Sequence, residues 1–175
     1  MQTVLKPPKT LLEVFQSLPE GTLCQLIHNE LIMSPSPKDI HQKILGKIYK
    51  QLDDFVEEND LGETRVAPYD VYFDNKNVFQ PDIIFIAKEN LHLIKENGLY
   101  GAPDMVIEIL SPSTEKYDKG PKKDIYEQYG VKEYWMVEPA DKSVTGYSLQ
   151  KNSFVPIAAN TGMVQSLLLN YAFGF

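Results

Sequence analysis

The strongest constraint in this sequence is an acidic residue inside an apolar run, Glu108 in the segment MVIEIL of residues 105–110. A second acid, Asp82, begins a similar run, DIIFI, at residues 82–86. Both runs are short, rich in β-branched residues and bounded by Pro, Gly or polar residues, which is typical of buried strands. A buried carboxylate is costly unless its charge is compensated. Because each of two such strands carries an acid, we expect the two carboxylates to share a cation.

Length and composition predict one domain that spans residues 1–175. A chain of this length can bury a sizeable core, and 43% hydrophobic and 23% charged residues are ordinary for a globular protein. No stretch approaches the roughly 18 apolar residues of a membrane helix, and the first residues lack the features of a secretory signal. The single cysteine, Cys24, excludes an internal disulfide and fits a reducing compartment. We therefore expect a cytoplasmic protein without membrane association.

The net charge of −7 argues against a protein that coats nucleic acid through a broad basic surface. It does not exclude a nuclease, because a metal-dependent enzyme concentrates acids at its site. Such an enzyme can confine its basic residues to one groove.

Hydrophobic spacing and turn residues predict the secondary structure. Apolar side chains three and four residues apart predict a long helix that begins at Ser36 and Pro37. The expected order is helix 10–17, hairpin 24–33 with its turn at His28-Asn29, the long helix, strands 63–67, 69–74, 82–87 and 104–110, a helix that ends at Gly130, and strands 133–138, 143–149 and 153–158. The polar segment 88–98 is compatible with a short helix. This order predicts an α/β (α+β) fold with helices packed on a single sheet.

Two acids on neighbouring strands supply the oxygen ligands that Mg²⁺ prefers. This ion is usually held by one or two carboxylates, with water and substrate phosphates completing its shell. A bound divalent ion lowers the pKa of a water ligand and neutralises charge that builds on a phosphate. The pattern therefore favours hydrolysis of a phosphate ester, with Asp82 and Glu108 as ligands of Mg²⁺ or Mn²⁺.

A lysine is expected to complete such a site, because a cation near the scissile phosphate stabilises developing negative charge. The position two after Glu108, on the same strand face, is Leu110 and not a lysine. The helix that follows supplies Lys122 instead, with Lys123 and Lys116 as alternatives. The residues spaced by four along one face of that helix are Asp118, Lys122 and Tyr126.

Motifs along the chain resemble those of the Uma family, which belongs to the restriction-endonuclease-like PD-(D/E)xK superfamily. The motifs are Pro81-Asp82, EILSPST from Glu108, Asp118-xxx-Lys122-xxx-Tyr126 and GVKEYW from Gly130. The likeness extends from CQLIHNELIMSPSP at residues 24–37, through His41, to the C-terminus. The pattern from E-x-L-S-P-S-T to G-V-x-E-Y-W is specific, whereas a lone PD carries little information.

The resemblance implies a mixed central β-sheet flanked by helices, a Mg²⁺ site and endonuclease activity on DNA. In that superfamily the acids of PD and ExK hold the metal, which corresponds to Asp82 and Glu108. The ExK lysine is displaced onto the helix, which corresponds to Lys122. Gln25 stands where family members usually have an acid, and a neutral amide is a weaker metal ligand. Glu30 is a nearby alternative for that auxiliary role.

Each candidate also has a purely structural interpretation. Asp82 can begin a strand with its carboxylate satisfied by turn amides, and Glu108 can form a buried ion pair with Lys122 or Arg65. His41 is interpreted as a structural residue or a substrate contact, because Mg²⁺ disfavours imidazole. Ser111 and Ser113 are interpreted as turn caps rather than nucleophiles, because no pair of a histidine and an acid is placed to activate them. Tyr126 and Tyr129 are interpreted as residues that pack against the sheet and expose their polar tips.

The leading hypothesis is a Mg²⁺-dependent endonuclease in which a metal-activated water attacks a DNA phosphate. The alternative is a non-catalytic oligomeric binding or accessory protein on the same fold, and an RNA-directed nuclease is a third possibility. The apolar ending LLLNYAFGF, residues 167–175, and the 10 Tyr and 8 Phe residues favour a homodimer or higher homo-oligomer. Equally, this tail can simply cover its own sheet.

Overall fold

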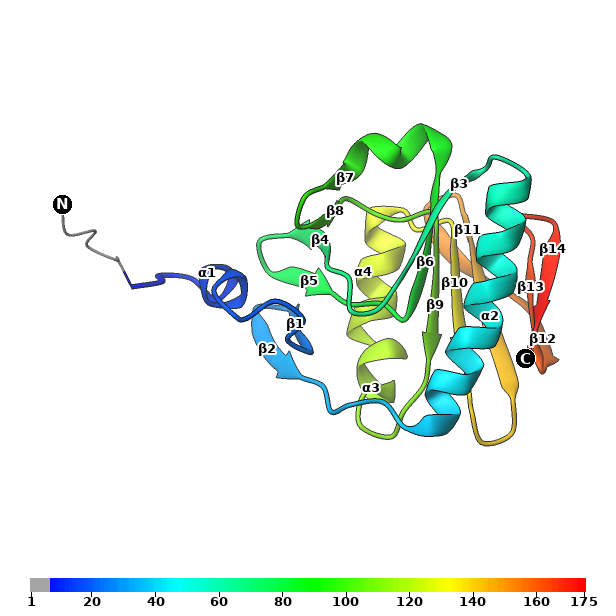
Figure 1. The fold of residues 1–175 in the computed structure, drawn as a ribbon, viewed down its shortest axis with the longest axis horizontal. Helices are drawn as coiled ribbons and strands as arrows, with labels where there is room; N and C mark the ends of the chain where they lie inside the picture. The colour runs from blue at the N-terminus through cyan, green and yellow to red at the C-terminus, as the bar shows by residue number, and fades with distance from the viewer. Residues whose placement is uncertain (1–6) are drawn as a thin grey trace.

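The structure is a computed structural model that describes residues 7–175, so residues 1–6 of the N-terminal stretch lie outside it. Within the described part, most strands belong to two six-stranded sheets (Figure 1). The central sheet has the order β12 (Ser153–Thr161), β11 (Ser143–Gln150), β10 (Glu133–Val137), β9 (Met105–Ile109), β6 (Ile83–Ala87) and β3 (Gly62–Val66). The second sheet has the order β2 (Glu30–Met33), β1 (Cys24–Ile27), β5 (Asn77–Phe79), β4 (Val71–Asp74), β8 (Gly98–Tyr100) and β7 (Ile94–Lys95). Each sheet combines antiparallel pairs with one parallel pair, β9 with β10 and β4 with β8.

Helices cover both faces of the central sheet (Figure 1). The helices are α1 (Leu11–Gln16), α2 (Asp39–Glu58), the 3-10 helix η1 (Lys88–Leu93), α3 (Glu115–Asp118) and α4 (Pro121–Tyr129). Along β9, Ile107 and Ile109 pack in one core with α2, whereas Val106 packs with Ile125 of α4 in the other. Because strand side chains alternate between faces, Glu108 faces α4. The second sheet contributes to the α4 core as well, so that core lies between the two sheets.

The predicted fold class, a mixed sheet flanked by helices with an N-terminal helix and hairpin, is confirmed. Thr10 caps α1 through a capping box with Glu13. His28 and Asn29 form the hairpin turn with φ of 48° and 63°, in the left-handed region. Gly130 ends α4 with φ of 86°, as a left-handed C-cap.

The sequence prediction was wrong at three places. The long helix begins at Asp39 with Lys38 as its N-cap, because the φ that Pro37 fixes suits extended chain as well as a first turn. The face carrying Asp118 and Lys122 is not one continuous helix, since Gly120 separates α3 from α4. The sheet is not single either: β5, β7 and β8 are only 2–3 residues long, too short to show an alternating pattern.

None of the helices within residues 7–175 has the length and apolar character needed to cross a bilayer.

The C-terminal hairpin, β13 (Met163–Ser166) and β14 (Tyr171–Gly174), packs against the central sheet beside α2. Its anchor is the carboxylate of Glu133 in β10, which is only 2% exposed. This carboxylate accepts hydrogen bonds from Trp135 Nε1 at 3.1 Å, Ser166 Oγ at 2.7 Å and the backbone N–H of Leu168. The predicted packing of Trp135 in a core strand is confirmed, since its side chain is fully buried.

Gly146 of β11 lies opposite Trp135 in the sheet register. A Cβ atom at this position would lie 2.1 Å from the Trp135 ring, so only glycine leaves room for the indole. We expect Gly146→Ala to lower the free energy of unfolding by about 1–3 kcal/mol, as overpacked cores do. Urea denaturation followed by circular dichroism measures this change.

Gly46→Ala is the matched control for that substitution. Gly46 lies in α2 with no atom within 4 Å of its added Cβ, so alanine should leave stability unchanged or raise it by up to about 1 kcal/mol. Equal stability of the Gly146→Ala variant and the wild type would show that Trp135 is not confined as described.

Candidate functional site

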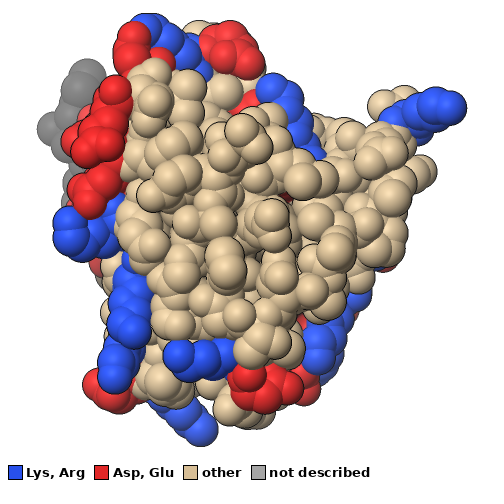
Figure 2. Space-filling model, turned by 90° about the vertical axis from the view of Figure 1, so that its right-hand side faces the viewer, with Lys and Arg blue, Asp and Glu red and all other residues tan. Residues whose placement is uncertain are grey.

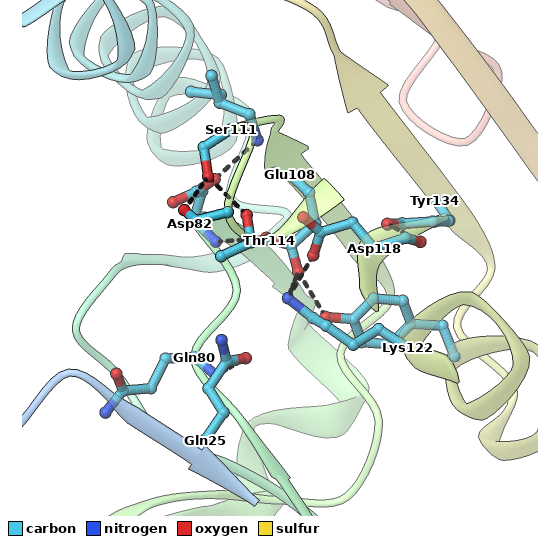
Figure 3. Close-up of polar contacts among 12 residues, drawn as sticks. Gln25, Gln80, Asp82, Glu108, Ser111, Thr114, Asp118, Lys122 and Tyr134 are labelled. Atoms are coloured by element: carbon cyan, nitrogen blue, oxygen red, sulfur yellow. Dashed lines mark hydrogen bonds and ion pairs between the residues drawn. The ribbon is translucent and has the colours of Figure 1, made fainter. Parts of the chain in front are cut away.

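The structure brings Glu108 and Lys122 into direct contact beneath the surface. Lys122, in the first turn of α4, reaches across to β9 and pairs with Glu108 Oε1 (Figure 3). Its Nζ also lies 2.8 Å from Asp118 Oδ1, so one lysine pairs with two carboxylates. All three side chains are at most 4% exposed. Tyr126 adds a hydrogen bond from its hydroxyl to Glu108 Oε1 at 2.7 Å.

Asp82 lies immediately before β6, at the edge of this cluster. Its Oδ2 accepts a 2.7 Å hydrogen bond from the backbone N–H of Ile109 and lies 3.1 Å from His41 Nε2. Its own backbone N–H lies 3.4 Å from Glu108 Oε2. The strand end at Asp82 and the strand carrying Glu108 are therefore adjacent, which brings the two predicted acids to one site (Figure 3).

The cluster contains more negative than positive charge. Burial raises the pKa of Glu108 to about 8, and the charges of Asp118 and Asp82 act in the same direction against the opposing effect of Lys122. Burial alone would lower the pKa of Lys122, but Asp118 and Glu108 outweigh it and raise that pKa, so the lysine stays charged. Burial therefore favours the protonated form of Glu108.

His41 responds to the same excess of negative charge. Burial lowers its pKa, but the hydrogen bond to Asp82 and the nearby carboxylates outweigh that effect and raise it above the ordinary value. The His41 imidazole is only 12% exposed and comes from the first turn of α2. It therefore contacts one of the predicted metal ligands, as a structural residue or a substrate contact would.

The donor set fits a hard divalent cation. Asp82 uses Oδ2 for its hydrogen bonds, and Glu108 uses Oε1 for its contacts with Tyr126 and Lys122. Glu108 Oε2 accepts only the 3.4 Å hydrogen bond from the Asp82 N–H, so Asp82 Oδ1 and Glu108 Oε2 are the least engaged oxygens. Residues 7–175 contain no group of three His, Cys, Asp or Glu side chains placed to hold an ion. Zinc sites need three or four such ligands, whereas Mg²⁺ is commonly held by one or two carboxylates with water.

Asp82 and Lys122 both line a pocket of about 930 Å³. Its wall is formed by the end of the first hairpin, the first turns of α2, and the loops after β9 and β10. The charged residues among those that line it are Lys38, Asp82, Asp118, Lys122 and Glu138. Glu108 is not among the lining residues, so the pocket meets the cluster at Asp82, Asp118 and Lys122, and it has few cations of its own.

The other candidate lysines lie elsewhere. Lys123 lies over the ring of Tyr147 at 4.5 Å and Lys116 over that of Tyr117 at 4.7 Å. Neither lines the pocket, so Lys122 is the lysine that the fold brings to Glu108. Arg65, the other proposed partner of Glu108, pairs with Glu63 instead.

Of the two candidate residues in the first hairpin, Gln25 lies at the pocket and Glu30 does not. Gln25 lines the pocket and its Oε1 accepts a 3.0 Å hydrogen bond from the backbone N–H of Gln80. Glu30 is exposed at the start of β2, outside the pocket lining. Ser111 and Ser113 bond to each other, and Ser111 also bonds to Thr114, while the N-cap of α3 has no side-chain hydrogen bond, so the predicted capping role is not seen.

Sequence reasoning missed two members of the cluster. Tyr126 was expected to expose its polar tip, but the side chain is fully buried and its hydroxyl donates to Glu108. The sequence predicts Asp118 on the same helical face as Lys122 but assigns it no function, and in the structure Asp118 is a buried partner of Lys122. The four-residue spacing of Asp118, Lys122 and Tyr126 was the available signal. Tyr129 does have the expected partly exposed position, with its hydroxyl 2.6 Å from Asp74 Oδ2.

Comparison with known proteins identifies the family. The chain matches Uma2, described as "putative restriction endonuclease", over residues 12–172. Among solved structures, it resembles a crystal structure from Anabaena variabilis described as a "putative nuclease belonging to DUF820". The TM-score is 0.70 at 21% sequence identity, over 86% of this chain and 84% of that chain, which shows a shared fold. No curated protein matches. Since the matched region covers almost the entire chain, the resemblance seen in its motifs is confirmed, and the protein belongs to the Uma2 family.

Proposed function

We propose that this protein is a nuclease that hydrolyses phosphodiester bonds in DNA with Mg²⁺ or Mn²⁺ as cofactor. The observation that carries the proposal is the buried cluster of Glu108, Asp118 and Lys122 beside Asp82, in which carboxylates outnumber cations. A cluster of this charge would be stabilised by a divalent ion, and its members Asp82, Asp118 and Lys122 line the pocket. Family membership supports the same activity.

In the proposed mechanism, Asp82 and Glu108 hold the ion, which would supply an activated water and neutralise charge on the phosphate. The chain's own residues orient these ligands. The Ile109 N–H and His41 fix Asp82, while Tyr126 and Lys122 fix Glu108. Lys122 pairs with Glu108 and Asp118 and also lines the pocket. Its ammonium group would there orient water or a phosphate oxygen.

The alternative function is a non-catalytic binding or accessory protein on the same fold. Two observations favour it: Glu108 and Lys122 satisfy each other as a buried ion pair, and only two of the pocket's lining residues are lysine or arginine. Calorimetry with millimolar Mg²⁺ or Mn²⁺ separates the two hypotheses, because the binding protein would take up no ion. Parallel assays on DNA and RNA would define the nucleic acid.

We predict that Asp82→Asn and Glu108→Gln each reduce Mg²⁺-dependent cleavage of plasmid DNA by roughly 10²–10⁴-fold. Both substitutions keep side-chain volume, so circular dichroism spectra should match the wild type. Asp54→Asn, at an exposed position of α2, is the control and should cleave at the wild-type rate. Cleavage by both site variants at the wild-type rate would refute the proposed roles.

The Glu108–Lys122 pair allows a test that separates structure from catalysis. Lys122→Met should cost about 3–5 kcal/mol of stability, because it leaves buried carboxylates without their cation. Lys123→Met, one position along, should change stability by no more than about 0.5 kcal/mol. The double variant Glu108→Gln with Lys122→Met should recover part of the lost stability without recovering cleavage. Recovery of cleavage along with stability would mean that the pair is purely structural.

Proton and metal should compete at Glu108. Its pKa is raised from 4.5 to about 8 on folding, so between these values the folded state keeps a proton that the unfolded state has lost. In EDTA, stability should therefore fall as pH rises through this window, and Glu108→Gln should remove that component. Added Mg²⁺ should raise the melting temperature most at the alkaline end, where the carboxylate is free. Thermal melts of both proteins with and without Mg²⁺ test this, and identical pH profiles in EDTA would contradict it.

A further inference from the structure

We propose that the surface formed by residues 152–175 is an interface at which two copies of this chain associate. These residues comprise β12, β13, β14 and their connections, and they contain no Asp, Glu, Lys or Arg, although 23% of the whole chain is charged. We call their exposed surface the uncharged face. The proposal is independent of nuclease activity.

Figure 2 looks onto the side of the molecule where β12, β13 and β14 lie in Figure 1. It shows a broad central area free of charged side chains, with Lys, Arg, Asp and Glu gathered mostly around its margin. An apolar centre with a charged rim is the usual anatomy of a protein–protein interface, in which charges are depleted at the core.

Large apolar side chains are concentrated on this face. Among the described residues, eight large hydrophobic side chains are exposed, and five of them belong to the uncharged face. Those five are Val155, Met163, Leu167, Leu168 and Tyr171. Leu167 is 59% exposed. Tyr171 is paired with Ser166, the residue directly before Leu167, so Tyr171 and Leu167 lie close together at the β13–β14 turn. Clusters of exposed apolar residues of this kind mark interaction sites.

The charge of the chain favours a second copy as the occupant. Each copy carries a net charge of −7, so contact between two charged faces would bring like charges together. In a two-fold dimer the same surface lies on both sides of the interface, and a face without charge can meet itself without that repulsion. A nucleic acid or an anionic membrane would need cations, which this face lacks.

The contact is expected to be made by side chains and not by pairing of strand edges. β12 is an edge strand of the central sheet, but Pro156 in its middle has no N–H to donate to a further strand. The exposed side chains of β12 and of the β13–β14 turn are therefore the contact surface.

Light scattering after size-exclusion chromatography tests the proposal over a micromolar concentration series. The wild type should show at least twice the chain mass of 19.9 kDa. Leu167→Asp and Val155→Asp, each placing a charge on the face, should each weaken association at least tenfold and shift the mass toward the monomer. Both sites are exposed, so melting temperatures should show that the monomers remain folded.

Met33→Asp is the matched control, because Met33 is 64% exposed but lies on β2, outside the uncharged face. This variant should keep the wild-type mass. A wild type that is monomeric throughout the series would overturn the proposal and leave the face to a different protein. It would also be overturned if both Asp variants of the face stayed associated, or if Met33→Asp dissociated the protein equally.

Discussion

The buried contact of Lys122 with Glu108 and Asp118 is the interaction on which the rest of this structure depends. It joins α4 and α3 to β9, so it holds the loop after β9 against the sheet as well as organising the site. A buried ion pair of this kind is weak evidence for stability, since desolvation opposes the Coulomb attraction. Three carboxylates with one lysine are harder still to explain by stability alone, and this excess of acids is the basis of the metal-dependent function proposed above.

Much of the fold was predictable because its long elements carry strong local signals. The 20-residue helix α2 has the expected apolar stripe, and β6, β9 and β10 are apolar except for Glu108 and Glu133, because both faces of these strands are buried. The second sheet was not predictable in the same way. Its strands β5 and β8 pair with strands far along the chain, Val78 opposite Leu26 and Leu99 opposite Val71, whereas β7 pairs only with the neighbouring β8. All three strands are too short to carry a pattern of their own.

The candidate site shows a similar division. Glu108 and Asp82 were visible because an acid in an apolar run is an anomaly, and their adjacency followed from the pairing of β6 with β9. The choice among three lysines could not be made from spacing, because the neighbouring residues Lys122 and Lys123 differ mainly in the direction in which the helix points their side chains, about 100° apart. Burial decided it: Lys122 faces the sheet, while Lys123 covers an aromatic ring. The bond from the Tyr126 hydroxyl to Glu108 could not be predicted either, because the sequence does not show that this side chain is fully buried.

The carboxylate of Glu133 has a consequence for biosynthesis. Its donors, Ser166 and Leu168, lie 33 and 35 residues further along the chain, so they leave the ribosome well after β10. Until they arrive, this carboxylate must remain hydrated, and the region of the sheet that β13 and β14 will cover stays open. A nascent chain that terminates before Ser166 would leave the Glu133 carboxylate without two of its three hydrogen-bond donors. Docking of the β13–β14 hairpin is therefore the step that closes this part of the core over Glu133.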